Sequence, residues 1–130
     1  MDPVVHFEIP LEESKRITKF YSKAFGWKMK PLGKKKDDYI LATTSMLNKD
    51  GTPQQAGIIN GGFYPKNKDW PAQYPSIVIA VDDIGESMKK VEKAGGKVLG
   101  EPMKIPGFGL YVSFYDTEGN RVSMMEPSMD

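Results

Sequence analysis

The residues best suited to chemistry lie near the start of the chain, in the stretch VVHFEIP. His6 is the only histidine, and Glu8 follows it two residues later. Because Val5, Phe7 and Ile9 alternate with these polar residues, the pattern predicts a strand that carries His6 and Glu8 on one face. An imidazole at that place could ligate a metal, act as a general acid or base, or serve as a hydrogen-bonded structural residue.

Other reaction chemistries lack the residues that they need. The chain has no cysteine, which excludes a disulfide framework, a thiolate zinc site and a thiol nucleophile. It contains no G-x-S-x-G nucleophile elbow. Its glycine pairs, in NGGF and KAGGK, have neither the spacing nor the strand-to-helix context of a phosphate-binding loop.

Composition and charge narrow the class of protein. At 130 residues the chain is expected to form a single domain over 1–130 with a substantial core. Its 18 basic and 17 acidic residues give a net charge of +1, so we expect no nucleic-acid partner. No apolar run approaches the ~20 residues of a membrane span. Since no signal-peptide pattern opens the chain either, we expect a cytoplasmic protein without a membrane partner.

The first half of the chain predicts a strand, a helix and three further strands. After the strand around His6, apolar residues recur at helical spacing until Gly26, which is expected to cap the helix. Short strands are predicted over 27–32, 39–44 and 57–64. The proline-rich segment 65–75 shows no periodicity and is predicted to be a linker.

The second half repeats this order of elements. SIVIAVDD predicts a strand, and DIGESMKKVEKAGG predicts a helix that begins at the N-cap Asp83, with Glu86 completing a capping box. Three more strands are expected in KVLGEPM, GLYVSFYD and RVSMME, the last two joined by the turn DTEGN.

The two halves also match in register. His6 precedes Gly26 by 20 residues, and Ser76 precedes Gly96 by the same interval, so the offset between halves is 70. We therefore predict an α+β fold of two tandem β-α-β-β-β modules, about 4–64 and about 76–127, that form a curved mixed sheet. Each module buries one sheet face under its helix, and the other face must line a partner sheet, a cavity or both.

These motifs resemble the glyoxalase / bleomycin-resistance / extradiol-dioxygenase superfamily, also called the vicinal oxygen chelate fold. The resemblance rests on HFEIP…KFYSKAFGWKM, VIAVDDIGESMKKVEKAGGKV and FYDTEGNRVSMMEP, and it covers residues 4–127. Thr117 departs from the family's usual DPxGN turn. Because the superfamily includes isomerases, lyases, dioxygenases, thiol transferases and drug-sequestering proteins, the resemblance implies a fold more specifically than a reaction.

The resemblance implies one metal-ligand position on the first strand of each module and one on the last. In this sequence we place these positions at His6, Gly61, Ser76 and Ser123. Glu126 has the same parity along its strand as Val122 and Met124, which are expected under the helix, so it lies on the wrong face to be a ligand. A divalent cation needs three or four convergent donors, and we therefore expect neither a bound metal nor another cofactor.

The fold implies a cup lined by the less apolar faces of the strands. Leu110, Val112 and Phe114 are predicted to pack in the core, and their alternating neighbours are predicted to face the cup. The expected ligand-binding residues are Gly61, Ser76, Val78, Tyr111, Ser113, Tyr115, Ser123 and Met125, with His6 and Glu8 as the catalytic candidates. Such a pocket would have aromatic walls, a few hydroxyl groups and one imidazole.

Two classes of function remain open at this point. In the first, the protein binds a small, partly hydrophobic molecule without a complete metal site. In the second, a lyase or isomerase uses His6, alone or with Glu8, as a general acid or base or as a weak metal ligand. For assembly we expect a homodimer, with Trp70 and Tyr74 as candidate contacts.

Overall fold

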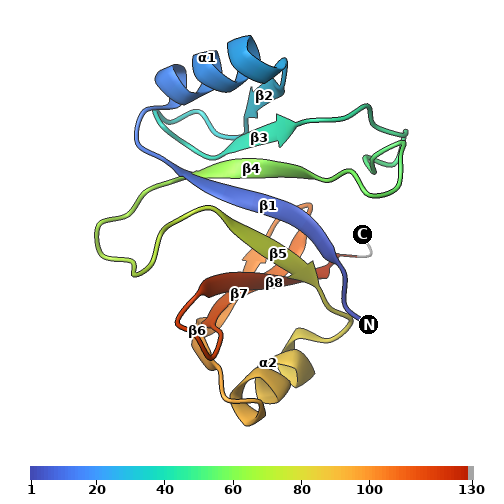
Figure 1. Ribbon diagram of the computed structural model, residues 1–130, viewed down its shortest axis with the longest axis vertical. Coiled ribbons are helices and arrows are strands. Elements are labelled where there is room, and N and C mark those ends of the chain that lie inside the picture. Colours follow the sequence, from blue (N-terminus) through green and yellow to red (C-terminus); the bar gives the residue numbers. More distant parts are fainter. Residues whose placement is uncertain (129–130) are drawn as a thin grey trace. The chain divides into compact units, whose positions relative to one another are not determined.

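The computed structural model describes residues 1–128 of the chain. The elements follow in the order β1 (Val4–Leu11), α1 (Ser14–Phe25), β2 (Lys28–Pro31), β3 (Ile40–Thr43), β4 (Asn60–Pro65), β5 (Ser76–Ala80), α2 (Ile84–Lys93), β6 (Lys97–Ile105), β7 (Gly109–Tyr115) and β8 (Arg121–Pro127) (Figure 1). The chain divides into two compact units. We call His6–Pro75 the N-terminal unit, and Met1–Val5 together with the residues from Ser76 onward the C-terminal unit.

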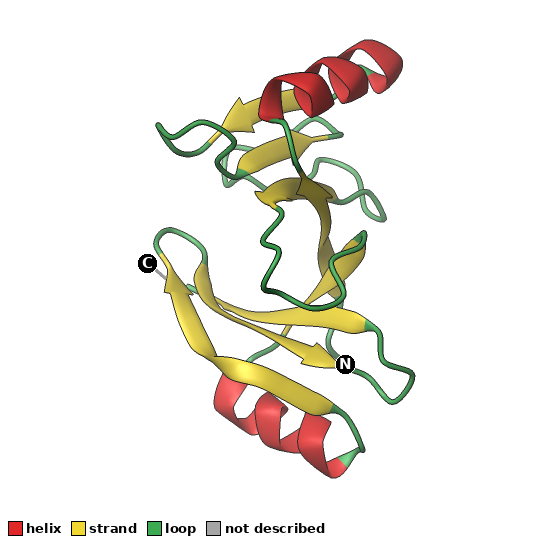
Figure 2. Ribbon diagram, turned by 90° about the vertical axis from the view of Figure 1, so that its left-hand side faces the viewer, coloured by secondary structure: helices red, strands yellow, loops and turns green. Residues whose placement is uncertain are grey.

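The N-terminal unit is a four-stranded sheet with α1 on one face (Figure 2). Its strand order is β2-β3-β4-β1, in which β1 runs parallel to β4 and the other neighbours are antiparallel. The core between sheet and helix is centred on four almost fully buried residues, Leu11, Ile40, Ala42 and Phe63. Alternate residues of each strand therefore point toward α1, and the remainder point to the opposite face.

Helix α1 ends where the sequence predicts. Gly26 has a left-handed φ of 72°, and its N–H donates to the carbonyl oxygen of Ser22 at 2.9 Å. Glycine adopts this backbone conformation without the steric penalty of a Cβ, which stops the helix at this residue. Tyr21 then connects the helix to the sheet, because its ring stacks on Trp27 at 4.8 Å and contacts Phe63 at 5.1 Å between centroids.

The C-terminal unit has the same construction. Its strand order is β5-β8-β7-β6, with β5 parallel to β8 and the other neighbours antiparallel. Val112 and Met124 are buried against the α2 side, and Leu110 and Phe114 pack on the same cluster. The predicted division of β7 into core-facing and opposite-facing residues is thus confirmed, as is the α+β fold of two β-α-β-β-β units.

Helix α2 is fixed at its N-terminus by the carboxylates of Asp83 and Glu126, which both accept hydrogen bonds from backbone N–H groups. Asp83 accepts a hydrogen bond from the backbone N–H of Glu86 at 3.0 Å, which confirms it as the N-cap. The Glu86 carboxylate lies 3.4 Å from the Lys89 ammonium, an exposed ion pair. Glu126, at the end of β8, accepts from the backbone N–H of Ile84 at 3.0 Å. Its side chain therefore serves the helix, in agreement with its predicted place on the helix-facing side.

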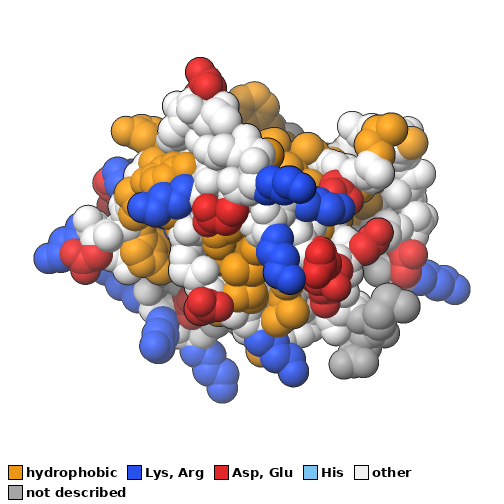
Figure 3. All heavy atoms as spheres, turned by 90° about the horizontal axis from the view of Figure 1, so that it is seen from below, with side chains coloured by type: hydrophobic (Ala, Val, Ile, Leu, Met, Phe, Trp, Pro, Cys, Tyr) orange, Lys and Arg blue, Asp and Glu red, His pale blue; other side chains and the backbone are white. Residues whose placement is uncertain are grey.

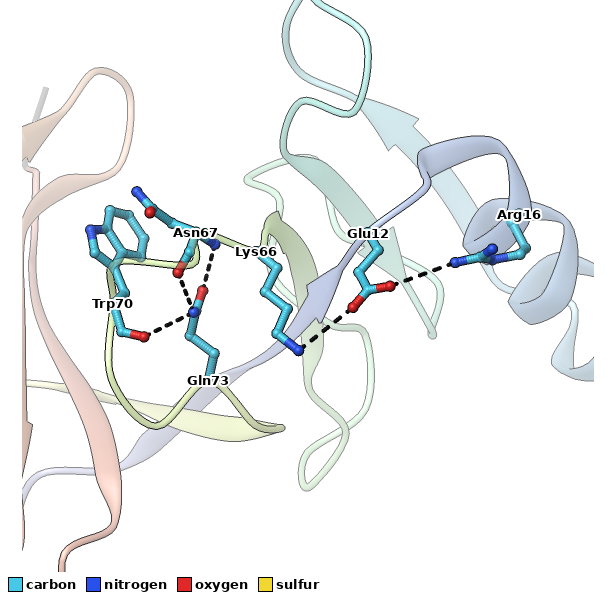
Figure 4. A network of polar contacts seen from close by, with 6 residues as sticks. All are labelled: Glu12, Arg16, Lys66, Asn67, Trp70 and Gln73. Atoms are coloured by element: carbon cyan, nitrogen blue, oxygen red, sulfur yellow. Dashed lines mark hydrogen bonds and ion pairs between the residues drawn. The ribbon is translucent and has the colours of Figure 1, made fainter.

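The segment after β4 is a loop organised around Gln73, whose side chain is buried (Figure 4). The Gln73 carbonyl oxygen accepts from the Asn67 N–H at 2.8 Å, and its amide nitrogen donates to the backbone oxygens of Asn67 and Trp70. One side chain thereby replaces the hydrogen bonds that a strand or helix would have supplied. At its start, Lys66 pairs with Glu12 at 3.6 Å, an exposed contact of small energetic value.

Within residues 1–128, neither helix is long and apolar enough to cross a membrane. On the face drawn in Figure 3, basic and acidic side chains are interspersed around hydrophobic groups.

Candidate functional site

In the N-terminal unit, the sheet face opposite α1 holds His6, Glu8 and Tyr39. His6 and Glu8 alternate with Phe7 and Ile9, both of which pack in the core under α1. The side chain of Tyr39, just before β3, reaches the imidazole, and its hydroxyl lies 3.1 Å from His6 Nε2. Glu8 is 7% exposed, so a carboxylate is buried close by on the same strand.

The two consecutive glycines of β4 explain how the aromatic rings fit against this sheet. Gly62 pairs with Glu8, and a Cβ built on Gly62 would overlap the Tyr39 hydroxyl. Gly61 pairs with Phe7, and a Cβ built there would overlap the Phe7 ring. Each glycine thus leaves room for an aromatic ring, one on each face of the sheet.

This register corrects one sequence prediction. Gly61 was expected on the same face as His6, but it shares a row with Phe7 and Ala42, which pack under α1. Gly62 takes the place expected of Gly61. The reason is that a one-residue change of register moves every side chain to the other face, and the sequence of β4 has no polar–apolar alternation to fix its register.

Burial controls the protonation of His6. Desolvation lowers the pKa of His6 from 6.5 to about 4, because a buried imidazolium loses its hydration. The imidazole is therefore neutral at pH 7. In one tautomer Nε2 accepts a hydrogen bond from the Tyr39 hydroxyl, and in the other Nε2–H donates to the Tyr39 oxygen.

In the C-terminal unit, the face opposite α2 carries a chain of three hydroxyl groups. The Tyr111 hydroxyl lies 2.7 Å from Ser123 Oγ, and Ser123 Oγ lies 3.0 Å from Ser113 Oγ. Ser113 and Ser123 are 5% and 3% exposed, so their hydroxyl groups are satisfied mainly by one another and by Tyr111. The structure therefore brings together three of the residues expected to bind a ligand.

The remaining expected ligand-binding residues of this unit lie around the hydroxyl chain. Val78 pairs with Ser123 and is almost fully buried, and Met125 pairs with Tyr111. Tyr115 pairs with Arg121 at the end of β7, and Ser76 begins β5. The face is therefore mixed, with a thioether, an aliphatic side chain and two phenols beside the serines.

The residues present do not fit a metal centre of the kind that the resemblance implies. Because Glu8 and Val78 are separated by the repeat offset of 70, their row partners Gly62 and Ser123 are equivalent positions. With His6 and Ser76, the four positions supply one imidazole, two hydroxyls and no side chain at all on Gly62. Among residues 1–128, no three His, Asp or Glu side chains are grouped so as to hold a metal ion.

Tyr39 is the member of the site that reasoning from sequence missed. The signal was present in the alternation of β3, because core residues Ile40 and Ala42 send Tyr39 and Leu41 to the opposite face. A glycine in the next strand along the sequence, Gly62 of β4, was the complementary signal. Only the pairing of β3 with β4 shows that this glycine and this tyrosine meet.

Comparisons with known proteins agree with this architecture. A glyoxylase-like domain-containing protein from Didymella fabae is 31% identical over 114 residues, covering 87% of this chain and 84% of that protein. A hypothetical protein from Bacillus halodurans has a similar structure, with a TM-score of 0.66 at 16% identity, covering 99% of this chain and 96% of that one. Methylmalonyl-CoA epimerase from Mycobacterium tuberculosis gives a TM-score of 0.66 at 12% identity, covering 96% and 87%.

At these low identities the two structures show the fold alone, whereas the family model is matched directly by the sequence. Residues 4–124 match the model of the Glyoxalase/Bleomycin resistance protein/Dioxygenase superfamily, so this chain belongs to that superfamily.

Proposed function

We propose that this protein binds a small, partly hydrophobic molecule on a sheet face opposite one of its helices, without a complete metal site made by its own side chains. One observation carries the proposal. Of the four positions implied as metal ligands, only His6 offers a strong donor, and its Nε2 is hydrogen-bonded to Tyr39. A single imidazole does not hold a divalent cation, because affinity comes from several donors fixed together.

The chemistry of the two faces supports this class of ligand. The phenols of Tyr39 and Tyr111 offer hydrogen bonds without full charges, and Ser123, itself bonded to Ser113, holds the Tyr111 hydroxyl in place. The half-buried Met125, which pairs with Tyr111, supplies apolar surface. Pockets with largely apolar walls and a few placed polar groups are typical of sites for small organic molecules.

A thermal-shift screen of tag-free protein against hydrophobic metabolites and antibiotics tests the proposal. A ligand at 100 times its Kd stabilises the folded state by about 2.7 kcal/mol, which raises Tm by roughly 10 °C for a domain of this size. We expect Tyr111→Phe to reduce the shift and the exposed-site control Gln55→Ala to retain it. A ligand whose shift is unchanged in Tyr39→Phe and Tyr111→Phe would show that these faces do not bind it.

A second candidate is a lyase or isomerase that uses His6 as a general acid or base. It is favoured by the position of the imidazole beside Tyr39 and a buried Glu8, and by the structural similarity to an epimerase. A pKa of about 4 makes His6 a weak base, which is why binding is the first proposal. Exchange of a C–H proton next to a carbonyl for deuterium, catalysed by the native protein and abolished in His6→Gln, would establish the enzyme.

We also propose that the protein is a cytoplasmic homodimer. Trp70 is 45% exposed and Tyr74 is 73% exposed, and aromatic side chains at the surface are enriched in subunit contacts. Light scattering at micromolar concentration should give about twice the 14.5 kDa mass of the chain, and Trp70→Ala should shift the equilibrium toward monomer. A monomer mass at that concentration overturns the proposed assembly, and cell fractionation tests the compartment.

A further inference from the structure

Tyr39 and Gly62 form a complementary pair on the face opposite α1. The Tyr39 hydroxyl lies where a side chain of residue 62 would begin, and it is held at 3.1 Å from His6 Nε2. The φ angle of Gly62 is not positive, so the backbone conformation does not require a glycine at this position. The Tyr39 hydroxyl occupies the space that a side chain on residue 62 would fill.

The repeated architecture allows Gly62 to be compared with the equivalent position of the C-terminal unit. Gly62 in the N-terminal unit is the register equivalent of Ser123 in the C-terminal unit, since their row partners Glu8 and Val78 are related by the offset of 70. Ser123 carries a hydroxyl that is bonded to the phenol of Tyr111. At the equivalent place in the N-terminal unit there is no side chain, and a phenol from outside the strand, that of Tyr39, takes its space.

We propose that Tyr39 is a specificity-determining residue. Its hydroxyl is hydrogen-bonded to Nε2 of His6 and fills the space next to Gly62. This face therefore presents a phenol–imidazole pair to its ligand in place of a metal ion. The inference rests on the proposed function and names the group that makes the site independent of metal. It concerns residues of the N-terminal unit only.

The electronic reason holds for either tautomer of His6. A metal binds the lone pair of a neutral imidazole nitrogen. If the Tyr39 hydroxyl donates to Nε2, that lone pair is already used, and if Nε2 carries the proton there is no lone pair to offer. A cation approaching Nε2 must therefore break the hydrogen bond and displace a ring that is packed over the backbone of Gly62.

The presence of a single histidine makes a direct test possible. In protein labelled with ¹⁵N at histidine and carrying no tag, every imidazole signal belongs to His6. We expect Tyr39→Phe to change the Nε2 chemical shift and to strengthen Zn²⁺ binding at pH 7 by about fivefold, the value of one hydrogen bond. The control Gln55→Ala, at an exposed side chain, should change neither.

A second pair of variants tests the steric part. Gly62→Glu combined with Tyr39→Ala supplies a carboxylate beside His6 and removes the ring, and it should bind Zn²⁺ at least ~10-fold more tightly than Gly62→Glu alone. Adding His6→Gln should abolish the gain.

The inference is overturned if Tyr39→Phe leaves the Nε2 signal and the Zn²⁺ affinity unchanged. It is also overturned if Gly62→Glu alone binds Zn²⁺ as tightly as the double variant. Because these experiments use Zn²⁺ and no organic ligand, their failure is distinct from the failure of the thermal-shift screen that tests the proposed function.

Discussion

The partly buried, neutral His6 predicts a specific pH dependence of folding stability. Burial lowers the pKa of His6 to about 4, whereas an unfolded imidazole titrates near 6.5. Between these values the unfolded chain binds a proton that the folded chain does not, so acidification favours unfolding. The free energy of unfolding should fall as the pH is lowered from about 6.5 to about 4, and the His6 contribution should be constant on either side of this window.

The magnitude follows from the two pKa values. One pKa unit corresponds to about 1.4 kcal/mol, so the full difference amounts to roughly 3 kcal/mol, of which roughly 2 kcal/mol is lost between pH 7 and pH 4.5. Urea unfolding of the native protein and of His6→Gln at both pH values measures this loss. Glutamine keeps a polar group that can reach Tyr39 but cannot be protonated, so the variant should lack the His6-dependent decrease.

The comparison between the two proteins isolates His6. The lowered pKa values of Asp37, which accepts from the Ser14 N–H, and of Asp50 and Asp116, which accept hydrogen bonds in their turns, affect stability only below about 4 and act equally in both proteins. Parallel loss of stability in native protein and His6→Gln between pH 7 and pH 4.5 would refute the reasoning. So would an imidazole that titrates near 6.5 in an NMR titration of the folded protein.

Three further predictions concern packing and hydrogen bonds. Gly61→Ala should destabilise the protein by about 1–3 kcal/mol in urea unfolding, because the new methyl group overlaps the ring of Phe7. Gln73→Ala should lower stability by about 1–3 kcal/mol and speed protease cleavage within 66–75, because the loop loses its buried amide. Glu126→Ala should cost about 1 kcal/mol by removing the acceptor of the Ile84 N–H at the start of α2.

Each of these predictions has a matched control. Gly85→Ala lies in α2 with only ordinary contacts and should be neutral or stabilising by up to about 1 kcal/mol. Gln55→Ala and Glu101→Ala remove the same side chains at exposed positions and should change stability by less than about 0.5 kcal/mol. Equal effects in a variant and its control would show that the named contact is not the cause.

The parts of the fold that depend on local chemistry were predictable from sequence. Gly26 ends α1 because its own backbone prefers a left-handed φ, and Asp83 begins α2 because its carboxylate reaches an N–H three residues away. The division of β7 into a core face with Val112 and an opposite face with Tyr111 follows from strict alternation along one strand. Each of these outcomes is decided within a few residues of chain.

The loop 66–75 was less predictable. Its prolines indicated an irregular segment, but its order comes from one buried amide, Gln73, that bonds backbone groups of Asn67 and Trp70. Nothing in the composition of the segment distinguishes this glutamine from an exposed one such as Gln55. The difference is created by how the chain folds back on itself.

The sequence by itself determined the two modules, their helices, the position of His6 on a strand and the scarcity of metal donors, because these follow from periodicity, from capping residues and from residue identity. The tertiary structure decided the register of β4 and therefore which glycine lies opposite Glu8. It also decided that Tyr39 is the partner of His6, a contact between residues 33 positions apart. Register and long-range contacts depend on which strands pair and on how rings pack between them, and a strand such as NGGFYP, without polar–apolar alternation, does not carry that information in its own sequence.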